Sequence, residues 1–192
     1  MQKIIAATKN KNKVREFKEI LPDFDIITQE EAGIDLDVEE TGTTFMENAL
    51  LKAKAIFEKT KIPSLADDSG LEVYALDGAP GVYSARYGGE GLDDKGRTKL
   101  LLENMKDIKD EDRGARFVSA IVFVTKDRVY EAEGVFEGVI AHEMKGANGF
   151  GYDPVFYVPE MGKTAAEMTP DEKNSMSHRG KALRALAEMV KN

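Results

Sequence analysis

The sequence predicts an α/β fold in which helices flank a mixed β-sheet. Short apolar runs typical of strands are interspersed with amphipathic stretches of helical period. Two long strand-like segments, 115–125 and 128–140, are separated only by Lys126 and Asp127, which predicts an antiparallel hairpin. The 192 residues are enough for one domain with a substantial core. A mixed sheet is therefore expected, and a regularly alternating wound sheet is not.

The N-terminal segment predicts a strand followed by a helix. Residues 3–8 form a short apolar run typical of a buried strand. Either Asn10 or Asn12 can cap the helix that follows, and Pro22 ends it. One face of this helix is apolar, with Val14, Phe17, Ile20 and Leu21.

A second strand and a second helix are predicted next, with an acidic loop between them. Residues 25–28 read as a short strand, and residues 30–43 show no period. Thr43 or Thr44 can cap a helix over about 44–60. The helix carries Phe45, Ala49, Lys52, Ala53 and Ile56 at helical spacing.

The middle of the chain predicts two short strands, a glycine-rich segment and a helix. Residues 64–70 are a brief apolar run, and we interpret their carboxylates as the end of a strand. Residues 71–76 alternate like a half-buried strand. Residues 78–89 are irregular, and a helix is expected around 93–105.

The C-terminal third predicts a hairpin, a strand and a final helix. After the hairpin, residues 146–159 read as a glycine loop that enters a strand. The last helix is expected over about 178–190, with Leu183, Leu186, Ala187 and Val190 on one face.

Composition excludes several classes of site and partner. With no cysteine and only two histidines, the chain cannot make disulfides, thiolate zinc sites or a three-histidine metal site. A metal would be bound mainly by oxygen, which favours Mg²⁺, with Mn²⁺ as the alternative. The net charge of -8 argues against a nucleic-acid polymer as partner. No apolar run is long enough for a bilayer and the start is no signal peptide, so no membrane partner and a cytoplasmic location are expected.

A candidate phosphate site lies between the first strand and the first helix. Thr8 and Asn10 provide neutral donors there, and Lys13 provides a positive charge. The N–H groups and the dipole of a helix N-terminus also favour phosphate. The alternative is a capped helix with a solvated basic face. The segment lacks the spacing of a P-loop.

Two acidic segments are candidate metal or water-activating sites. Asp67 and Asp68 follow an apolar run and precede Ser69, and a divalent ion or an activated water would explain them. The alternative is an Asx turn. Glu39 and Glu40 offer further metal oxygens, or they belong to a solvated acidic loop.

Two aromatic residues and one lysine are also candidates for ligand contact. Phe150 or Tyr152 can offer a face to a nucleobase, or both can lie in the core. Lys52 is either a surface lysine with a buried stem or the partner of a phosphate or carboxylate.

A third polar cluster lies at the expected start of the last helix. Lys173, Ser177, His178 and Arg179 can offer donors to a phosphate or to a base carbonyl. The alternative is a helix cap at Ser177 with Arg179 in water. His178 as a general base is disfavoured, because the sequence has no Ser/His/Asp order and no nucleophile elbow.

The order of these motifs resembles the inosine triphosphate pyrophosphatase family. The resemblance runs from the first strand to the last helix. It is carried by six blocks, TKNKNK (8–13), EETGTTFMENALLKA (39–53), ADDSGL (66–71), GAPGVYSARY (78–87), FGYDPVF (150–156) and SHRGKAL (177–183).

The resemblance implies an elongated mixed sheet with two lobes around a central substrate cleft, in a single domain spanning 1–192, and a homodimer. It implies a Mg²⁺ site made by Asp68 with Glu39 or Glu40, and Glu39 is preferred as the direct ligand. It also makes Asp68 the acceptor of the water proton. The residues predicted to bind substrate are Thr8, Lys9, Asn10, Lys11, Asn12, Lys13, Lys52, Ser69, Phe150, Gly151, Tyr152, Asp153, Lys173, His178 and Arg179.

The implied activity is hydrolysis of non-canonical purine triphosphates (ITP, dITP and XTP) to monophosphate and pyrophosphate, which removes them from the nucleotide pool. The expected reaction is attack of a metal-assisted water on the α-phosphorus. Two alternatives are a pyrophosphatase for modified pyrimidine nucleotides and a nucleotide sensor without catalysis. An oligonucleotide-binding module is least favoured.

Overall fold

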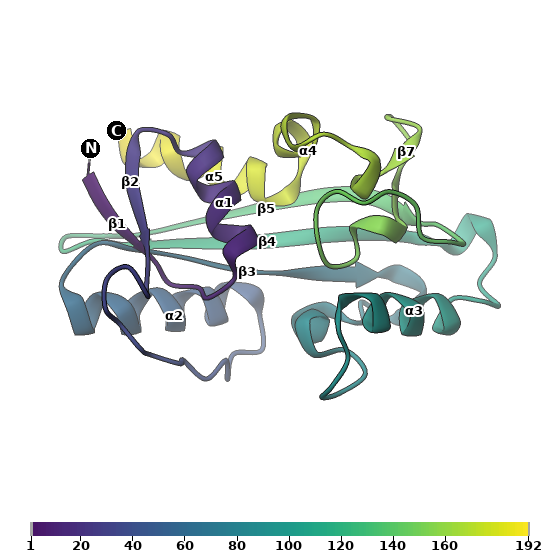
Figure 1. Cartoon of the computed structure of the whole chain (residues 1–192), viewed down its shortest axis with the longest axis horizontal. Helices are drawn as coiled ribbons and strands as arrows, with labels where there is room; N and C mark the ends of the chain where they lie inside the picture. The colour runs from purple at the N-terminus through teal and green to yellow at the C-terminus, as the bar shows by residue number, and fades with distance from the viewer. Residues whose placement is uncertain (1, 192) are drawn as a thin grey trace. The chain divides into compact units, whose positions relative to one another are not determined.

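The computed structural model describes residues 2–191 and shows helices packed on a seven-stranded sheet (Figure 1). The helices are α1 (Lys11–Ile20), α2 (Phe45–Thr60), α3 (Asp94–Asn104), α4 (Pro170–Met176) and α5 (His178–Lys191). The strands are β1 (Gln2–Ala6), β2 (Phe24–Thr28), β3 (Ser64–Val73), β4 (Gly114–Val124), β5 (Val129–Ile140), β6 (Phe156–Val158) and β7 (Lys163–Thr164).

The sheet is mixed, as predicted. Its strand order is β2-β1-β3-β4-β5-β6-β7. β1 pairs in parallel with both β2 and β3, whereas β6 pairs antiparallel with β5 and β7. β4 and β5 are the predicted hairpin, closed by a turn in which the Thr125 N–H donates to the Arg128 carbonyl over 2.9 Å. The parallel pairs at one end and the antiparallel pairs from β5 to β7 at the other confirm that the sheet is not regularly wound.

The helix caps also follow the sequence. Asn10, not Asn12, caps α1, and its side chain accepts from the N–H groups of Asn12 and Lys13. Thr44 caps α2 in a capping box with Glu47.

The prediction of two strands around residues 64–76 is wrong. β3 is one continuous strand of 10 residues, and Asp67 and Asp68 lie in its middle rather than at an end. Residues 74–76 form a short 3-10 helix. Adjacent acids are tolerated inside the strand because cations from three helices contact them, as described below.

Two elements were not predicted, namely α4 and the short strand β7. α4 begins with a signal that the sequence does contain. Thr169 caps it in a capping box with Glu172, and Pro170 occupies its first turn.

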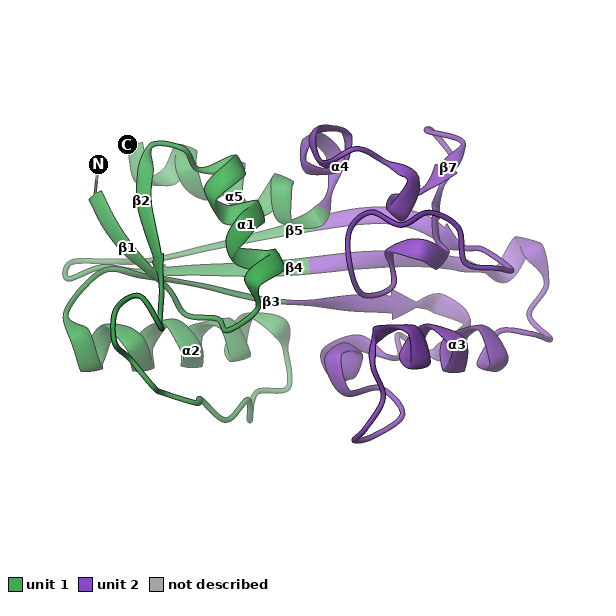
Figure 2. Ribbon diagram, viewed as in Figure 1, with its two compact units in different colours: residues 1–68, 119–134, 178–192 green, residues 69–118, 135–177 purple. Residues whose placement is uncertain are grey.

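The chain divides into two compact units. Unit 1 comprises residues 1–68, 119–134 and 178–192, and unit 2 comprises residues 69–118 and 135–177 (Figure 2). No helix in the described range, 2–191, is long and apolar enough to cross a membrane.

Unit 1 has an apolar cluster on each face of its part of the sheet. On one face, Phe17 of α1 and Leu183 of α5 pack with Leu65 of β3. On the other face, Ala53 of α2 packs with Ala66 of β3 (Figure 1). Leu65 and Ala66 are adjacent, so the pleat of β3 directs its even and odd positions to different helices.

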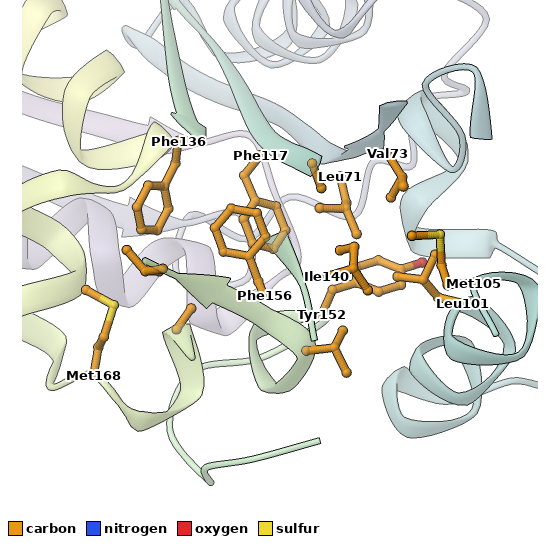
Figure 3. Packing of buried hydrophobic residues seen from close by; sticks show 14 residues of the cluster. Leu71, Val73, Leu101, Met105, Phe117, Phe136, Ile140, Tyr152, Phe156 and Met168 are labelled. Carbon is orange, nitrogen blue, oxygen red and sulfur yellow. The ribbon is translucent and has the colours of Figure 1, made fainter. Parts of the chain in front are cut away.

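Unit 2 has a core of its own, rich in aromatic side chains. Phe117, Phe136 and Phe156 lie together, and the ring centroids of Phe117 and Phe156 are 4.4 Å apart (Figure 3). Tyr152 belongs to this core, where its hydroxyl donates to the Ser84 carbonyl over 2.7 Å. Burial also raises the pKa of Tyr152 above its ordinary value.

Candidate active site

The two adjacent aspartates of β3 have different surroundings. Successive side chains of a strand point to opposite faces of the sheet. Asp67 therefore follows Leu65 toward α1 and α5, and Asp68 follows Ala66 toward α2. The three helices and residues 64–68 of β3 belong to unit 1, so one short stretch of strand supplies an acid to each face.

Asp67 is fully buried and held by cations. Its Oδ1 lies 2.5 Å from the Lys13 Nζ, and its Oδ2 accepts from the Arg179 Nε over 3.1 Å. The hydroxyl of Ser119 also donates to Oδ2, over 2.6 Å. Burial would raise the pKa of the Asp67 carboxyl, but the charges of Arg179 and Lys13 outweigh it and hold that pKa well below its ordinary range. Asp67 is therefore a fixed anion and a poor proton acceptor.

Arg179 is 2% exposed and joins Asp67 to a second buried acid. Its Nη1 donates to the Oε2 of Glu16, which α1 carries. Two residues of this network, Glu16 and Ser119, were not predicted as site residues. The sequence contains a signal for Glu16, a charged residue one helical turn from Lys13 on α1.

Asp68 contacts a different cation, Lys52. The Lys52 Nζ donates to the Asp68 Oδ1 over 3.1 Å, to the Glu40 Oε1 over 2.7 Å and to the Asp67 carbonyl over 2.9 Å. The other Asp68 oxygen, Oδ2, is buried and has no hydrogen-bond partner among residues 2–191. Burial raises the pKa of the Asp68 carboxyl, against the opposing charge of Lys52. Asp68 thus has a free acceptor oxygen and an increased affinity for a proton.

Lys52 is an inward-facing lysine, not a surface one. Its side chain is 13% exposed. Burial disfavours its charge, but Asp68 and Glu40 outweigh burial and raise the pKa of the Lys52 ammonium. Of the two alternatives for this residue, the structure favours the partner of a carboxylate.

Of the two candidate metal glutamates, Glu40 lies beside Asp68. Residues 34–42 alternate between half-buried and exposed positions, as expected for an extended segment. Glu40 is half-buried against Lys52, whereas Glu39 is exposed. The geometry therefore favours Glu40, although Glu39 was preferred from the sequence.

The predicted phosphate segment forms the N-terminus of α1. The Thr8 hydroxyl accepts from the Asn10 N–H over 3.1 Å, and the Asn10 side chain caps the helix. Lys9 and Lys11 are exposed. Lys13 points inward to Asp67, and burial lowers the pKa of its ammonium although Asp67 opposes this effect. The helix is capped as the alternative interpretation expected, but Lys13 does not lie on a solvated face, and the phosphate site stays a prediction.

Unit 2 brings three predicted residues together. The Lys173 Nζ lies 2.6 Å from the Asp153 Oδ2 and 4.8 Å from the centroid of the Phe150 ring. The Phe150 N–H also donates to the Asp153 Oδ2, over 3.0 Å. Gly151 lies beside them, and its N–H donates to the Oδ2 of Asp94 over 3.1 Å.

The remaining predicted residues are less accessible than expected. Tyr152 lies in the unit 2 core, so its ring does not offer a free face. His178 is 4% exposed at the start of α5. The guanidinium of Arg179 is engaged by Glu16 and Asp67, which differs from the expectation that it holds a base or points to water. Ser69 is half-buried, next to Asp68 on β3.

The carboxylates are compatible with a divalent ion that also binds substrate. Within residues 2–191, no cluster of three or more His, Cys, Asp or Glu side chains is placed to bind a metal. Glu40 and Asp68 provide two carboxylates that lie close together, since both accept from the Lys52 ammonium. Mg²⁺ is commonly bound by one or two carboxylates together with water and substrate phosphates. This pair meets that requirement.

Known proteins are similar to this chain over its full length. A dITP/XTP pyrophosphatase of Pectobacterium atrosepticum is 50% identical and that of Escherichia coli K12 is 49% identical, each over 100% of both chains. The structure of a HAM1 protein from Coxiella burnetii matches with a TM-score of 0.90 and 44% identity, over 100% of this chain and 99% of that one. The Ham1 protein of Staphylococcus aureus matches with a TM-score of 0.89 and 42% identity, over 99% and 98% of the two chains.

These relatives confirm two predictions. The matching structures have the same fold, and pyrophosphatases are hydrolases, so the chain is an enzyme of that class. The model of the Ham1 family matches residues 4–189. With the family model, the relatives and the fold in agreement, the chain belongs to the Ham1 family.

Proposed function

We propose that this enzyme hydrolyses non-canonical purine nucleoside triphosphates, namely ITP, dITP and XTP, to the monophosphate and pyrophosphate. The names of the full-length relatives, dITP/XTP pyrophosphatases, support this substrate class. The observation that carries the proposal is Asp68, a buried acid beside Lys52 and Glu40, one oxygen of which has no hydrogen-bond partner within the described range.

In the proposed reaction, Asp68 accepts the proton of the attacking water. Its Oδ2 is available for this because Lys52 engages only Oδ1. The raised pKa of Asp68 increases its strength as a base. The water attacks the α-phosphorus, the bond from that phosphorus to the bridging oxygen breaks, and pyrophosphate leaves.

Mg²⁺ is the proposed cofactor, with Mn²⁺ as the alternative. Glu40 and Asp68 would hold it, together with triphosphate oxygens. When bound, the ion supplies charge neutralisation for the phosphates.

Lys13 and Lys52 are the proposed phosphate lysines. Both ammonium groups are largely buried, where their charges are less screened than at the surface. The amino end of α1 adds N–H groups and a partial positive charge. Neutralisation of pyrophosphate by these groups would supply electrostatic stabilisation.

The base pocket remains a prediction. The C6 carbonyl and N1–H of hypoxanthine and xanthine differ from the pattern of adenine, so an unpaired donor would reject adenine. Phe150, Asp153 and Lys173 are the predicted contacts that the structure brings together. Arg179 is withdrawn from this role because its guanidinium is buried against two acids. A homodimer is also proposed, on the family resemblance alone.

The direct test is pyrophosphate release from ITP, ATP and GTP, each with Mg²⁺ and with a chelator. We expect metal-dependent release from ITP at about 100-fold or more over the other two. Release of orthophosphate would mean that another bond is cut. No turnover of any of the three would favour the sensor or the modified-pyrimidine alternative.

Matched variants test the choice of metal glutamate. Glu40→Gln keeps the shape of the side chain but removes the charge beside Asp68, and we expect the Mg²⁺ concentration for half-maximal rate to rise about tenfold or more. Glu39→Gln is the control at the neighbouring exposed position. It should change the Mg²⁺ concentration for half-maximal rate by less than about twofold. The opposite ranking would restore Glu39 as the ligand.

A further inference from the structure

Four buried or largely buried charges of unit 1 form a chain of ion pairs. Glu16 contacts Arg179, Arg179 contacts Asp67, and Asp67 contacts Lys13. The side chains of Glu16, Arg179 and Asp67 are 5%, 2% and 0% exposed, whereas that of Lys13 is 14% exposed. Among these four residues, Lys13 is therefore the one that solvent or a ligand can contact.

The first and last residues of this series of ion pairs, Glu16 and Lys13, both belong to helix α1. Lys13 and Glu16 are three residues apart on α1, so both project from one side of the helix. Arg179 extends from α5, and Asp67 extends from β3. α1 and α5 also contact each other directly (Figure 2). One helix is thus fixed at two points one turn apart, which restrains its rotation about its own axis.

Each link of the network fixes the direction of the next. The Asp67 Oδ2 accepts from Ser119 over 2.6 Å and from the Arg179 Nε over 3.1 Å. Its Oδ1 accepts from the Arg179 Nη2 over 3.4 Å and contacts Lys13, so the guanidinium holds both oxygens in place. Glu16 engages the other edge of the Arg179 guanidinium, at Nη1. A rigid planar guanidinium transmits this orientation better than a flexible ammonium does.

Stability alone is a weak explanation for these buried charges. Desolvation of a buried ion pair often cancels its Coulombic gain, so apolar residues of similar volume can do as well. A closed network of this kind instead specifies one arrangement of its members.

We propose that Glu16 is a positioning residue for Lys13, acting through Arg179 and Asp67. The inference rests on the proposed function, in which Lys13 binds the triphosphate. Glu16 itself is too deeply buried to touch a substrate, and its effect is on the place and freedom of the Lys13 ammonium and of the α1 N-terminus.

The test compares Glu16→Gln with Glu19→Gln, a matched change on the same helix at an exposed position. With ITP and Mg²⁺, we expect Glu16→Gln to lower kcat/KM about tenfold or more, mainly through KM, because misplaced phosphate contacts weaken binding. The kcat/KM of Glu19→Gln should stay within about twofold of the wild-type value. Circular dichroism and thermal unfolding show whether each variant is folded.

A double-mutant cycle distinguishes an effect of Glu16 on the position of Lys13 from a general loss of structure. In a Lys13→Met background, Glu16→Gln should lower kcat/KM by less than about threefold, because its target is already gone. An undiminished tenfold loss in that background would overturn the proposal. If Glu16→Gln does not fold, Glu16→Asp keeps the charge but shortens its reach, and an unchanged KM in that variant would also overturn it.

A second readout does not depend on turnover. Acylation of the Lys13 amine by acetic anhydride, followed by mass spectrometry, reports how firmly the ammonium is held. We expect Lys13 to react about threefold faster in Glu16→Gln than in the wild type or in Glu19→Gln, since a displaced amine is more accessible. Equal rates would contradict positioning. Wild-type enzyme that releases no pyrophosphate from ITP would refute the proposed function, while the labelling result would still decide the role of Glu16.

Discussion

Two neighbouring carboxyl groups differ in what they can do because of their surroundings. Asp67 is saturated by Lys13, Arg179 and Ser119 and is held as an anion. Asp68 keeps one oxygen that no group in residues 2–191 engages, and burial raises the pKa of its carboxyl. Titratable pairs whose environments push their pKa values apart are typical of acid–base sites. This contrast supports Asp68, and not Asp67, as the proton acceptor.

Asp68→Asn should separate activity from stability. Loss of a general base lowers kcat by about 10²- to 10⁴-fold. The folded protein holds the Asp68 charge at a cost, because burial raises its pKa, so the neutral amide should not lower Tm. Pyrophosphate release and thermal unfolding of the same preparation are the measurements. A kcat loss below about tenfold would exclude Asp68 as the base.

Asp67→Asn should change the pH dependence of stability. Arg179 and Lys13 outweigh burial and depress the folded-state pKa of Asp67, so its stabilising contribution is present above the unfolded pKa of about 3.9 and is lost as pH falls below it. We expect Asp67→Asn to lose about 3 kcal/mol at pH 7, because it leaves buried cations without their anion. Urea unfolding at several pH values should show that this difference shrinks below about pH 4. A constant difference would contradict the assignment.

At the residue scale, the sequence indicated which residues carry chemistry but not how they pair. Adjacent acids and a lysine among alanines marked Asp68 and Lys52 as unusual. The partner of Asp67, Arg179, is 112 positions away, so spacing along the chain carried no information about that contact. Arg179 was expected at the substrate because a basic residue before a helix resembles an anion site, and only the fold shows that two acids already occupy it.

At the scale of elements, the sequence predicted the features that depend on nearby residues, namely the helix caps and the hairpin turn. The cap at Asn10, the capping box at Thr44 and the turn of the hairpin each depend on residues a few positions apart. β3 was divided wrongly because buried acids are unusual in a strand, and their neutralising cations come from α1, α2 and α5. β7 is only two residues long and has no sequence period to detect.

A substitution at Gly134 tests how closely β5 and α5 pack. A Cβ at this position would lie 2.0 Å from the His178 carbonyl oxygen and 2.8 Å from the Ala182 nitrogen. Backbone atoms cannot move aside cheaply, so Gly134→Ala should cost about 1–3 kcal/mol of unfolding free energy. Gly114→Ala on β4 is the control, since its Cβ would meet only the Tyr74 side chain, at 3.0 Å. Urea unfolding measures both, and equal losses would contradict the close approach.

For the whole molecule, the pattern of apolar segments predicted the fold class, and the order of the motifs predicted the family. The order of the sheet was not predictable from the period of single segments. β1 lies between β2 and β3, and pairs such as Ile5 with Ser64 join residues far apart in the chain. Non-local pairing of this kind depends on which faces bury together, and the amphipathic pattern of one element does not specify its neighbour.

The charge of the whole chain predicts its behaviour toward nucleic-acid polymers. At a net charge of -8, no binding to a single-stranded oligonucleotide is expected at physiological salt, because few counterions would be released. Fluorescence anisotropy with a labelled oligonucleotide measures this. A Kd at or below about 1 μM would reopen the oligonucleotide-binding alternative.

The pleat of β3 also has a consequence for protein engineering. Because neighbouring positions 67 and 68 face different helices, a change at 68 leaves the ion pairs of Asp67 with Lys13 and Arg179 in place. A protein altered only at Asp68 is therefore expected to stay folded and to retain its triphosphate uncleaved. Immobilised on a resin, such an inactive variant could capture uncleaved nucleotides from a cell extract. Mass spectrometry of the bound nucleotides would then identify the physiological substrate.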